Sequence, residues 1–248
     1  ILIKGGTFLC SLTKQREEVP DIYIAKYTVT NQHYRRFISY LESKDLEFAD
    51  ILPVATYEEK LRTVAKEVKK FSEYLQTCTS LCTAFCCDMD STDEQFNKDD
   101  QPVVRVNWFA AQAYCMWLSL LESNGLDSGR YGLPGNIEWE YAAAGKDGRE
   151  YPWSHEKGEP TPKHANYNKI NGNTTPVGNY PHGITPEGLY DMAGNVWEWT
   201  KDWADRKSCF IRGGSWSFGT NDLLCSSFDH VDPKNKNLDI GFRVIRKT

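Results

Sequence analysis

The chain has 248 residues, of which 40% are hydrophobic and 25% are charged, and its net charge is -5. This length can bury a substantial core, so folding need not depend on disulfide bonds. Lysines and arginines are scattered apart from a short basic face at Lys66, Lys69 and Lys70, which argues against nucleic acid as a partner. No apolar run approaches the roughly 20 residues that a transmembrane helix requires, so no membrane-spanning segment is expected.

The first residues, ILIKGGTFLC, start inside a strand-like pattern without an initiator Met. This start predicts that a leader or anchor segment has been removed, and that the protein is exported to the cell surface. It is compatible with a lipid anchor outside the given sequence. The even count of eight cysteines agrees with an oxidising compartment, although Cys115 is expected to be a small buried hydrophobic residue.

Two helices are expected in the main body. Thr30 and Asn31 are cap candidates for a helix in TVTNQHYRRFISYLES, where the apolar side chains follow helical spacing. The second helix begins near Asn107 and ends at Gly125. One face of the second helix should carry Trp108, Ala111, Tyr114, Trp117, Leu118 and Leu121.

Residues 45–100 are interpreted as an insertion between these helices. Its centre, residues 56–82, is predicted to form one long amphipathic helix that packs on the main body. The expected apolar stripe is Leu61, Val64, Val68, Phe71 and Leu75. At its end, CTSLCTAFCC carries Cys78, Cys82, Cys86 and Cys87, for which disulfides or buried thiols are favoured over metal binding, because no paired knuckle or histidine accompanies them.

From Arg130 onward the sequence becomes rich in Gly, Pro, Asn and Trp. This composition is typical of long ordered loops held in place by aromatic packing. The last such stretch is bounded by RGGSW and GFRV, whereas residues 217–232 between them follow neither a helical nor a strand period. We therefore expect an α+β domain with little regular structure for its size.

Several stretches together resemble the formylglycine-generating-enzyme (sulfatase-modifying factor) domain. They are GGTFLC, IAKYTVTNQHYRRF, QPVVRVNWFAAQAYCMWL, LPGNIEWEYAAAG, GLYDMAGNVWEWTKDW, IRGGSW and IGFRV. The resemblance implies the C-type lectin fold, with small antiparallel sheets, two main helices and long ordered loops. It covers nearly the whole chain, so we expect one domain over residues 1–248, with the helical insertion at about 45–100 and a C-terminal variable region at about 212–246.

The resemblance also implies a structural calcium site in the loop DMAGNVWE. The matching positions are Asp191, Gly194, Val196 and Glu198, and such a mixture of oxygens suits a hard cation. The alternative is that a carboxylate caps local backbone amides. A second family site would involve Asn166 and Tyr167, but NYNKINGNTTPV contains no Asp to complete it.

The family's oxidase activity, by resemblance, needs two cysteines that hold copper(I) after the Gly-Gly-Ser motif. Phe218 and Leu223 stand at those positions, and Cys225 is nearby but alone. The related iron-dependent sulfoxide synthases take three histidines from an additional helical domain, and the scattered histidines here predict no such cluster. These are His33, His155, His164, His182 and His230. We expect no catalytic cofactor and no enzymatic activity.

The ending RGGSW…GFR also resembles the variable proteins of diversity-generating retroelements, in which random substitution of template adenines alters Asn codons. Codons altered in this way do not encode Lys, Glu, Gln, Trp or Met, and residues 217–232 contain none of these five types. The resemblance implies a display protein that binds a variable protein or another surface ligand. The expected contact residues are Ser217, Phe218, Gly219, Asn221, Asp222, Ser227, Phe228, Asp229, His230 and Val231, which we call the contact surface.

A rigid frame must then hold this surface, and Trp216, Ile240 and Phe242 are expected to be buried in it. Two other interpretations stay open. One is a catalytically inactive family member with an ordinary exposed loop, and the other is an oxidase that uses Cys209 or Cys225.

Overall fold

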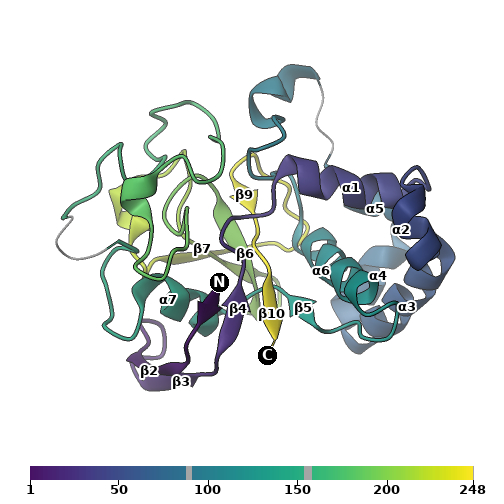
Figure 1. Cartoon of the computed structure of the whole chain (residues 1–248), viewed down its shortest axis with the longest axis horizontal. Helices are drawn as coiled ribbons and strands as arrows, with labels where there is room; N and C mark the ends of the chain where they lie inside the picture. Colours follow the sequence, from purple (N-terminus) through teal and green to yellow (C-terminus); the bar gives the residue numbers. More distant parts are fainter. Residues whose placement is uncertain (88–90, 154–157, 248) are drawn as a thin grey trace.

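The structure, a computed structural model, describes residues 1–87, 91–153 and 158–247. Figure 1 shows an α+β arrangement, in which most helices gather on one side and the strands, α7 and the long loops on the other. This architecture confirms the predicted fold class. No helix of the described part is both long and apolar enough to cross a membrane.

The two expected helices are present. Helix α1 spans Asn31–Leu41, and the Thr30 hydroxyl accepts its first capping hydrogen bond from the amide of His33. Helix α6 spans Trp108–Glu122 and is capped by Asn107, while Gly125 follows its end with a φ of 81°. The rings of Tyr34 and Tyr114 stack with centroids 5.7 Å apart, so the two helices share one core.

The prediction of one long inserted helix is wrong. The insertion forms α2 to α5 and the short helix η1, with bounds Leu46–Ile51, Val54–Glu67, Lys69–Gln76, Leu81–Phe85 and Ser91–Phe96. Helix α3 ends at Val68, whose backbone is extended, with φ -115° and ψ 92°. Val64 and Val68, expected in the buried stripe, are each 36% exposed, and Tyr57 and Ala65 are buried in their place.

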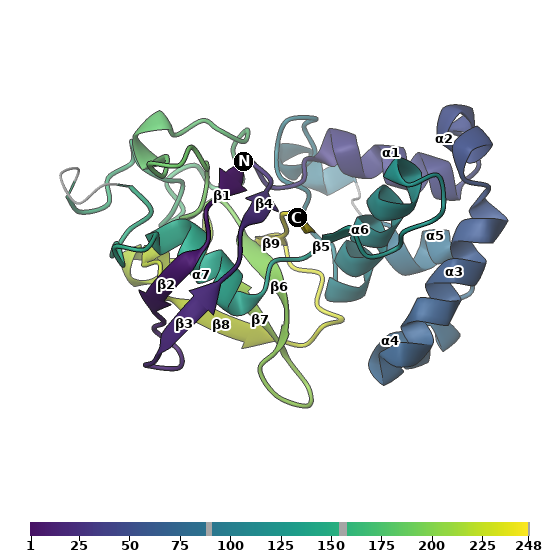
Figure 2. The same cartoon turned by 60° about the horizontal axis from the view of Figure 1, so that its bottom comes forward.

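Three small sheets organise the rest of the chain. The first has the order β1-β4-β10-β5 (Leu2–Ile3, Ile22–Ile24, Ile245–Lys247, Tyr131–Gly132), and it brings the two ends of the chain together, as Figure 2 shows. The second is the hairpin of β2 and β3 (Gly6–Leu9, Arg16–Val19). The third has the order β8-β7-β6-β9 (Phe228–Val231, Cys209–Arg212, Trp197–Trp203, Ile240–Gly241). Its β6–β9 pair is parallel, contrary to the expectation of antiparallel sheets.

Helix α7 (Asn136–Ala144) and the short helices η3 (Pro181–Gly183) and η4 (Thr220–Leu223) complete the fold. Trp197 and Trp199 are buried beneath the C-terminal loop, and so are Ile240 and Phe242. Trp216 is only half-buried, contrary to expectation. One side of its ring packs on Phe96, with ring centroids 5.6 Å apart, and its indole N–H donates to the Leu238 carbonyl. The part of the ring outside these contacts is accessible to solvent.

Candidate functional site

The C-terminal segment leaves strand β6 and returns to it. Glu198 of β6 is paired with Arg212 of β7 on one side and with Gly241 of β9 on the other. The segment between them contains η4 and the edge strand β8, which pairs only with β7 in its sheet. Its two ends are therefore fixed on either side of one buried strand.

Arg212 anchors the first end through a fully buried guanidinium. It forms an ion pair with Glu140 of α7, with 2.8 Å between the nitrogen Nη2 and the carboxylate oxygen. Its Nη1 donates to the main-chain carbonyls of Cys225 and Ser227, both at 3.2 Å. The guanidinium thus holds the returning loop through backbone atoms, which every residue type supplies.

Arg243 anchors the second end in a similar way. Its Nε and Nη2 each donate to one oxygen of Glu198 at 2.7 Å, and both side chains are fully buried. The indole N–H of Trp139 donates to the same carboxylate at 2.7 Å. Burial of such a pair is tolerated because the fork geometry and the additional donor satisfy the carboxylate.

The loop between these anchors is also held by its main chain. The carbonyl of Phe218 accepts from the amide of Asn168 at 2.7 Å, and the amide of Cys225 donates to the carbonyl of Glu150 at 2.8 Å. Gly214 has a φ of 71°, and a Cβ there would lie 2.7 Å from the carbonyl oxygen of Asp222. A larger residue at Gly214 would therefore displace the loop.

None of the ten residues of the contact surface is buried. Those exposed are Phe218, Gly219, Asn221, Phe228, Asp229 and His230, and those half-buried are Ser217, Asp222, Ser227 and Val231. They fall in two segments, residues 217–222 at and before η4 and residues 227–231 at strand β8. Their role in binding remains a prediction.

The two exposed aromatic residues rest on the buried frame. Phe218 is 38% exposed and packs edge-on against Trp197, with ring centroids 5.5 Å apart. Phe228 is 39% exposed and lies against Phe210 and the guanidinium of Arg212. Each ring is therefore positioned by residues outside the contact surface and presents an apolar edge to solvent.

The stretch 217–232 is more regular than expected, because it includes η4, strand β8 and two buried side chains. Leu223 packs in a cluster with Trp153 and Tyr167, and Cys225 packs in the cluster around α7. The burial of Leu223 and Cys225 was not predicted from the sequence. The apolar run Leu-Leu-Cys within an otherwise polar stretch was the available signal.

The residues expected to hold calcium are close together but otherwise engaged. Both oxygens of Glu198 accept from Arg243, and Oδ2 of Asp191 accepts from the amide of Gly178 at 2.7 Å. The carbonyl of Gly194 accepts from the amide of Val196 at 2.9 Å. Burial raises the pKa of Asp191 to about 6, which further weakens it as an anionic ligand. The donor set therefore fits the alternative, a loop held by hydrogen bonds, and does not fit calcium.

The positions of the second family site lie in a network of amides. Buried Asn166 donates to the carbonyl of Asn173 and to Oδ1 of Asn195, and it accepts from Nδ2 of Asn171. Tyr167 is buried as well and donates to the carbonyl of Pro160. These contacts cross-link the loop beside Gly194 without a carboxylate.

Phe218 and Leu223 stand at the two positions of the family's copper-binding cysteines. Their surroundings differ from each other, since Phe218 is exposed and Leu223 is fully buried. Burial raises the pKa of the Cys225 thiol well above its usual range, and that of Cys209 likewise. Thiols of this kind are poor nucleophiles and metal ligands. Within the described ranges no three His, Cys, Asp or Glu residues are grouped to hold a metal ion, and His155 lies outside those ranges.

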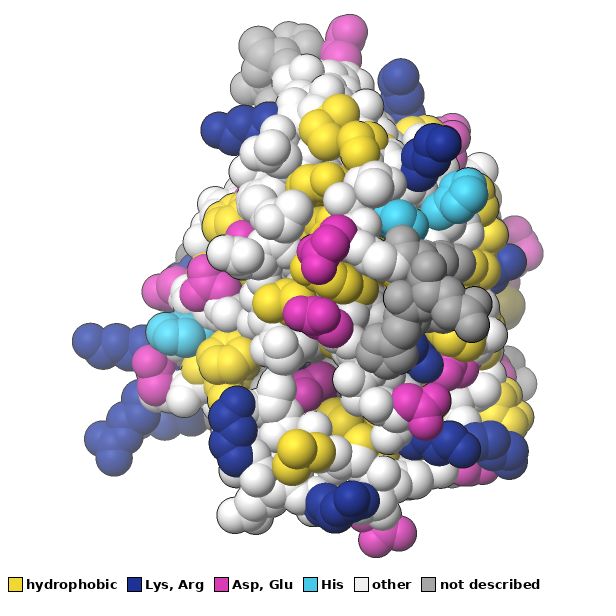
Figure 3. Space-filling model, turned by 90° about the vertical axis from the view of Figure 1, so that its left-hand side faces the viewer, with side chains coloured by type: hydrophobic (Ala, Val, Ile, Leu, Met, Phe, Trp, Pro, Cys, Tyr) yellow, Lys and Arg dark blue, Asp and Glu magenta, His cyan; other side chains and the backbone are white. Residues whose placement is uncertain are grey.

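Figure 3 shows the face on the side of the long loops. Acidic and basic side chains are interspersed there, and hydrophobic side chains are exposed between them. Such a mixed face differs from the concentrated basic patch that nucleic-acid binding requires.

Solved structures with the same fold include PvdO from Pseudomonas aeruginosa, with a TM-score of 0.65 and 21% identity, covering 100% of this chain and 94% of that one. CarF gives a TM-score of 0.66 at 19% identity, covering 100% and 97%. Treponema denticola variable protein 1 gives 0.61 at 20% identity, covering 100% and 92%. At these identities the likeness shows the fold alone.

Curated relatives include proteins with different names. Serine/threonine-protein kinase Pkn1 of Chlamydia trachomatis is 30% identical over 98% of this chain and 37% of its own length. Hercynine oxygenase of Mycobacterium tuberculosis is 38% identical over 58% of this chain and 36% of its own. Inactive C-alpha-formylglycine-generating enzyme 2 of Bos taurus is 36% identical over 46% and 38%. The chain therefore spans little more than a third of the length of these relatives.

The profile of the sulfatase-modifying factor enzyme 1-like domain matches residues 1–248. The buried pairs Arg212–Glu140 and Arg243–Glu198 give a structural reason for its motifs, because each joins a C-terminal motif to the body of the fold. The chain belongs to the sulfatase-modifying factor enzyme 1-like (formylglycine-generating-enzyme) domain family, with a C-type-lectin-like fold.

Proposed function

We propose that this chain is a non-enzymatic ligand-binding domain that uses the contact surface. The observation that carries the proposal is the way in which the loop is held. Arg212 and the amide of Asn168 contact main-chain carbonyls of the loop, while the side chains of Phe218 and Phe228 are partly exposed to solvent. A surface built in this way can change its side chains without losing its support.

The finer proposal is that a retroelement diversifies this surface by adenine mutagenesis. The absence of Lys, Glu, Gln, Trp and Met from residues 217–232 supports it, and Asn221, Asn235 and Asn237 fit codons that have kept their adenines. Six of the ten contact-surface residues are exposed, which is where variation costs least stability. Leu223 and Cys225 would be constrained to apolar types.

The partner is proposed to be a protein or another surface ligand, bound by a protein displayed outside the cell. Phe218 and Phe228 would be its aromatic anchors, since a few partly exposed aromatic residues dominate the energy of many interfaces. The match to Pkn1 over 98% of this chain but 37% of that protein supports a domain that also occurs as one module of longer proteins.

A second candidate is a catalytically inactive family domain whose loop does not vary. The Bos taurus relative named as inactive favours it, and so do the Phe218 and Leu223 side chains at the expected thiolate positions. Both candidates share the absence of oxidase activity. The purified protein should not bind copper(I) stoichiometrically or convert a cysteine-containing peptide to formylglycine. Turnover abolished by Cys225→Ser would overturn both.

Sequencing the locus from several isolates separates the two candidates. Diversification predicts a nearby template that differs from the coding segment mainly at adenines, with changes concentrated in the codons for residues 217–232. An invariant segment with no such template would leave the inactive domain as the function.

A further inference from the structure

A groove of about 490 Å³ lies between the inserted helices and the main body, and it shares no lining residue with the contact surface. Leu61 and Val64 of α3 and Phe71 of α4 line it together with Trp108 and Met116 of α6. Its size is within the range of small-molecule sites, which are typically about 300–1,000 Å³ and mostly apolar. The insertion thus creates a hollow that the main body alone would not have.

The lining is mostly apolar, with Gln112 and Ser128 as its uncharged polar side chains. The indole N–H of Trp108 donates to the carbonyl of Thr200 at 2.8 Å. Oδ2 of Asp202, at the edge of the groove, accepts from the amide of Asn136 at 2.6 Å. Val64 and Val68 remain 36% exposed, and both face this groove. Covering them would remove apolar surface from water, which is favourable.

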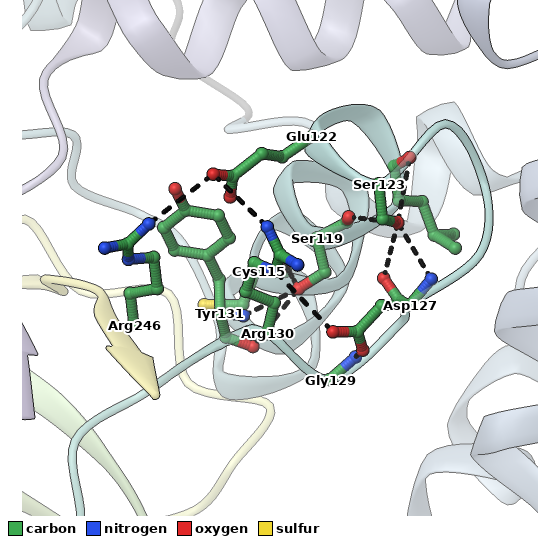
Figure 4. A network of polar contacts seen from close by, with 10 residues as sticks. Cys115, Ser119, Glu122, Ser123, Asp127, Gly129, Arg130, Tyr131 and Arg246 are labelled. Atoms are coloured by element: carbon green, nitrogen blue, oxygen red, sulfur yellow. Dashed lines mark hydrogen bonds and ion pairs between the residues drawn. The ribbon is translucent and has the colours of Figure 1, made fainter. Parts of the chain in front are cut away.

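The wall formed by residues 128–132 is fixed before any ligand binds. Figure 4 shows its support: Oγ of Ser119 accepts from the amide of Tyr131 at 2.8 Å, and Oδ1 of Asp127 accepts from the amide of Gly129 at 2.8 Å. Arg130 lies 3.5 Å from Glu122, which also pairs with Arg246 at 3.6 Å. A wall held in this way loses little conformational freedom on binding.

The edge of the groove is cationic. Lys201 and Lys247 line it together with the acid Asp202, and Lys201 is also paired with Glu138 at 3.3 Å. Lys247 therefore supplies most of the positive charge, together with Lys70, whose Nζ lies 4.5 Å from the ring of Trp203, another lining residue. Beyond Lys247 the groove continues into a second hollow that Asp127, Arg130 and Arg246 also line, where Asp127 and Glu122 pair with the arginines. The two share Gly129 and Lys247, so an apolar floor leads to an edge with positive charges.

We propose that this groove binds a small amphipathic anion, such as a fatty carboxylate. The apolar body lies between α3 and α6, and the charged group lies at the Lys201 and Lys247 edge. The apolar floor matches the alkyl tail of such a ligand, and the positive charges at the edge match its anionic head group. We therefore expect anionic amphiphiles to bind more tightly than neutral or cationic ones. This site is independent of the contact surface and of its diversification.

Isothermal titration of the purified protein with dodecanoate, below the concentration at which it forms micelles, tests the proposal. Dodecanoate should bind at one site and change the tryptophan fluorescence, because Trp108 and Trp203 line the groove. Dodecyltrimethylammonium, with the same tail and the opposite charge, should bind at least tenfold more weakly. Equal binding of the two amphiphiles, or no binding of dodecanoate, would overturn the proposal.

Two variants locate the site. Val64→Glu places a negative charge in the groove and should abolish dodecanoate binding, whereas Ala55→Glu makes the same change of charge at an exposed position of α3 outside the groove and should not. Lys247→Gln should weaken dodecanoate up to about fivefold and leave dodecanol unchanged. Unchanged binding in both Val64→Glu and Lys247→Gln would refute this location. Binding to phosphatidylglycerol vesicles without binding of monomeric dodecanoate would reassign the groove to a membrane surface.

Discussion

The guanidinium of Arg212 and the carboxylate of Glu140 form an ion pair at 2.8 Å, and both side chains are almost completely buried. The same carboxylate accepts from the amide and the hydroxyl of Ser11, both at 2.7 Å. The pair therefore ties three parts of the chain to one another: the N-terminal region, helix α7 and the C-terminal loop.

Replacing Arg212 should be strongly destabilising. Arg212→Met leaves the Glu140 carboxylate buried without its cation, which costs about 3–5 kcal/mol in the free energy of unfolding. Exposed Arg206→Met, the matched control, should change it by less than about 0.5 kcal/mol. The double variant Arg212→Met with Glu140→Leu should recover part of the loss. Urea denaturation measures all three, and equal stability of Arg212→Met and Arg206→Met would contradict the anchoring role.

Exchanging exposed residues of the contact surface should alter ligand choice and cost less stability than truncating one buried side chain. The combination Phe218→Ser, Asn221→Tyr, Asp229→Asn and His230→Tyr should lower the free energy of unfolding by no more than about 2 kcal/mol, at most about 0.5 kcal/mol for each site. By contrast, Leu223→Ala alone should cost about 2–5 kcal/mol, and Phe242→Ala about 3–5 kcal/mol, because each truncates a fully buried side chain. Failure of the fourfold variant to fold would show that these side chains belong to the frame.

Asp191 should make stability depend on pH. Burial raises its pKa to about 6 in the folded protein, against about 3.9 in an unfolded chain. Between these values the folded state keeps a proton that the unfolded state has released, so the free energy of unfolding falls as pH rises from about 4 to 6. A difference of two pKa units corresponds to about 3 kcal/mol.

Asp191→Asn removes this titration, and Asn also tolerates the φ of 55° at this position. Relative to the native protein, the variant should gain stability as pH rises from 4 to 7 and show a constant difference above that. Thermal melts of both proteins across this range make the comparison. Parallel curves would mean that Asp191 does not carry the raised pKa.

Calcium should not stabilise the protein specifically. Arg243 and Trp139 already donate to Glu198, so a cation would have to displace a buried guanidinium. Melting temperatures with calcium, with magnesium at equal ionic strength and with chelator should agree. A calcium-specific gain near 2.7 kcal/mol at a hundredfold excess over the dissociation constant would show that Glu198 can leave Arg243.

The sequence predicts the helices at 31–41 and 108–122 because their signals are local, namely a capping side chain followed by apolar residues at helical spacing. The break at Val68 escaped prediction because the apolar stripe continues through it, while the chain turns to bury Tyr57 and Ala65 instead of the valines. Periodicity identifies an apolar face but not where a helix ends.

The exposure of the contact surface was predicted from its aperiodic sequence and from the resemblance to variable proteins, whereas the buried ion pairs that hold it were not predicted. Arg212 and Glu140 are 72 positions apart, and Arg243 and Glu198 are 45 apart. No local pattern pairs residues at such distances. For the same reason the sequence could suggest Glu198 as a cation ligand but could not reveal that a buried arginine occupies it.

The pairing of Glu198 with Arg212 on one side and Gly241 on the other has a consequence for loop length. Two strand spacings, about 10 Å, separate the strands β7 and β9, whatever lies between their ends. Lengthening the intervening loop costs little, since each doubling of its length adds only about 0.6 kcal/mol of closure entropy. Insertions next to exposed Gly219, beyond Arg212 and before η4, should therefore be accepted, so the fold can accommodate contact surfaces of different reach as well as different chemistry.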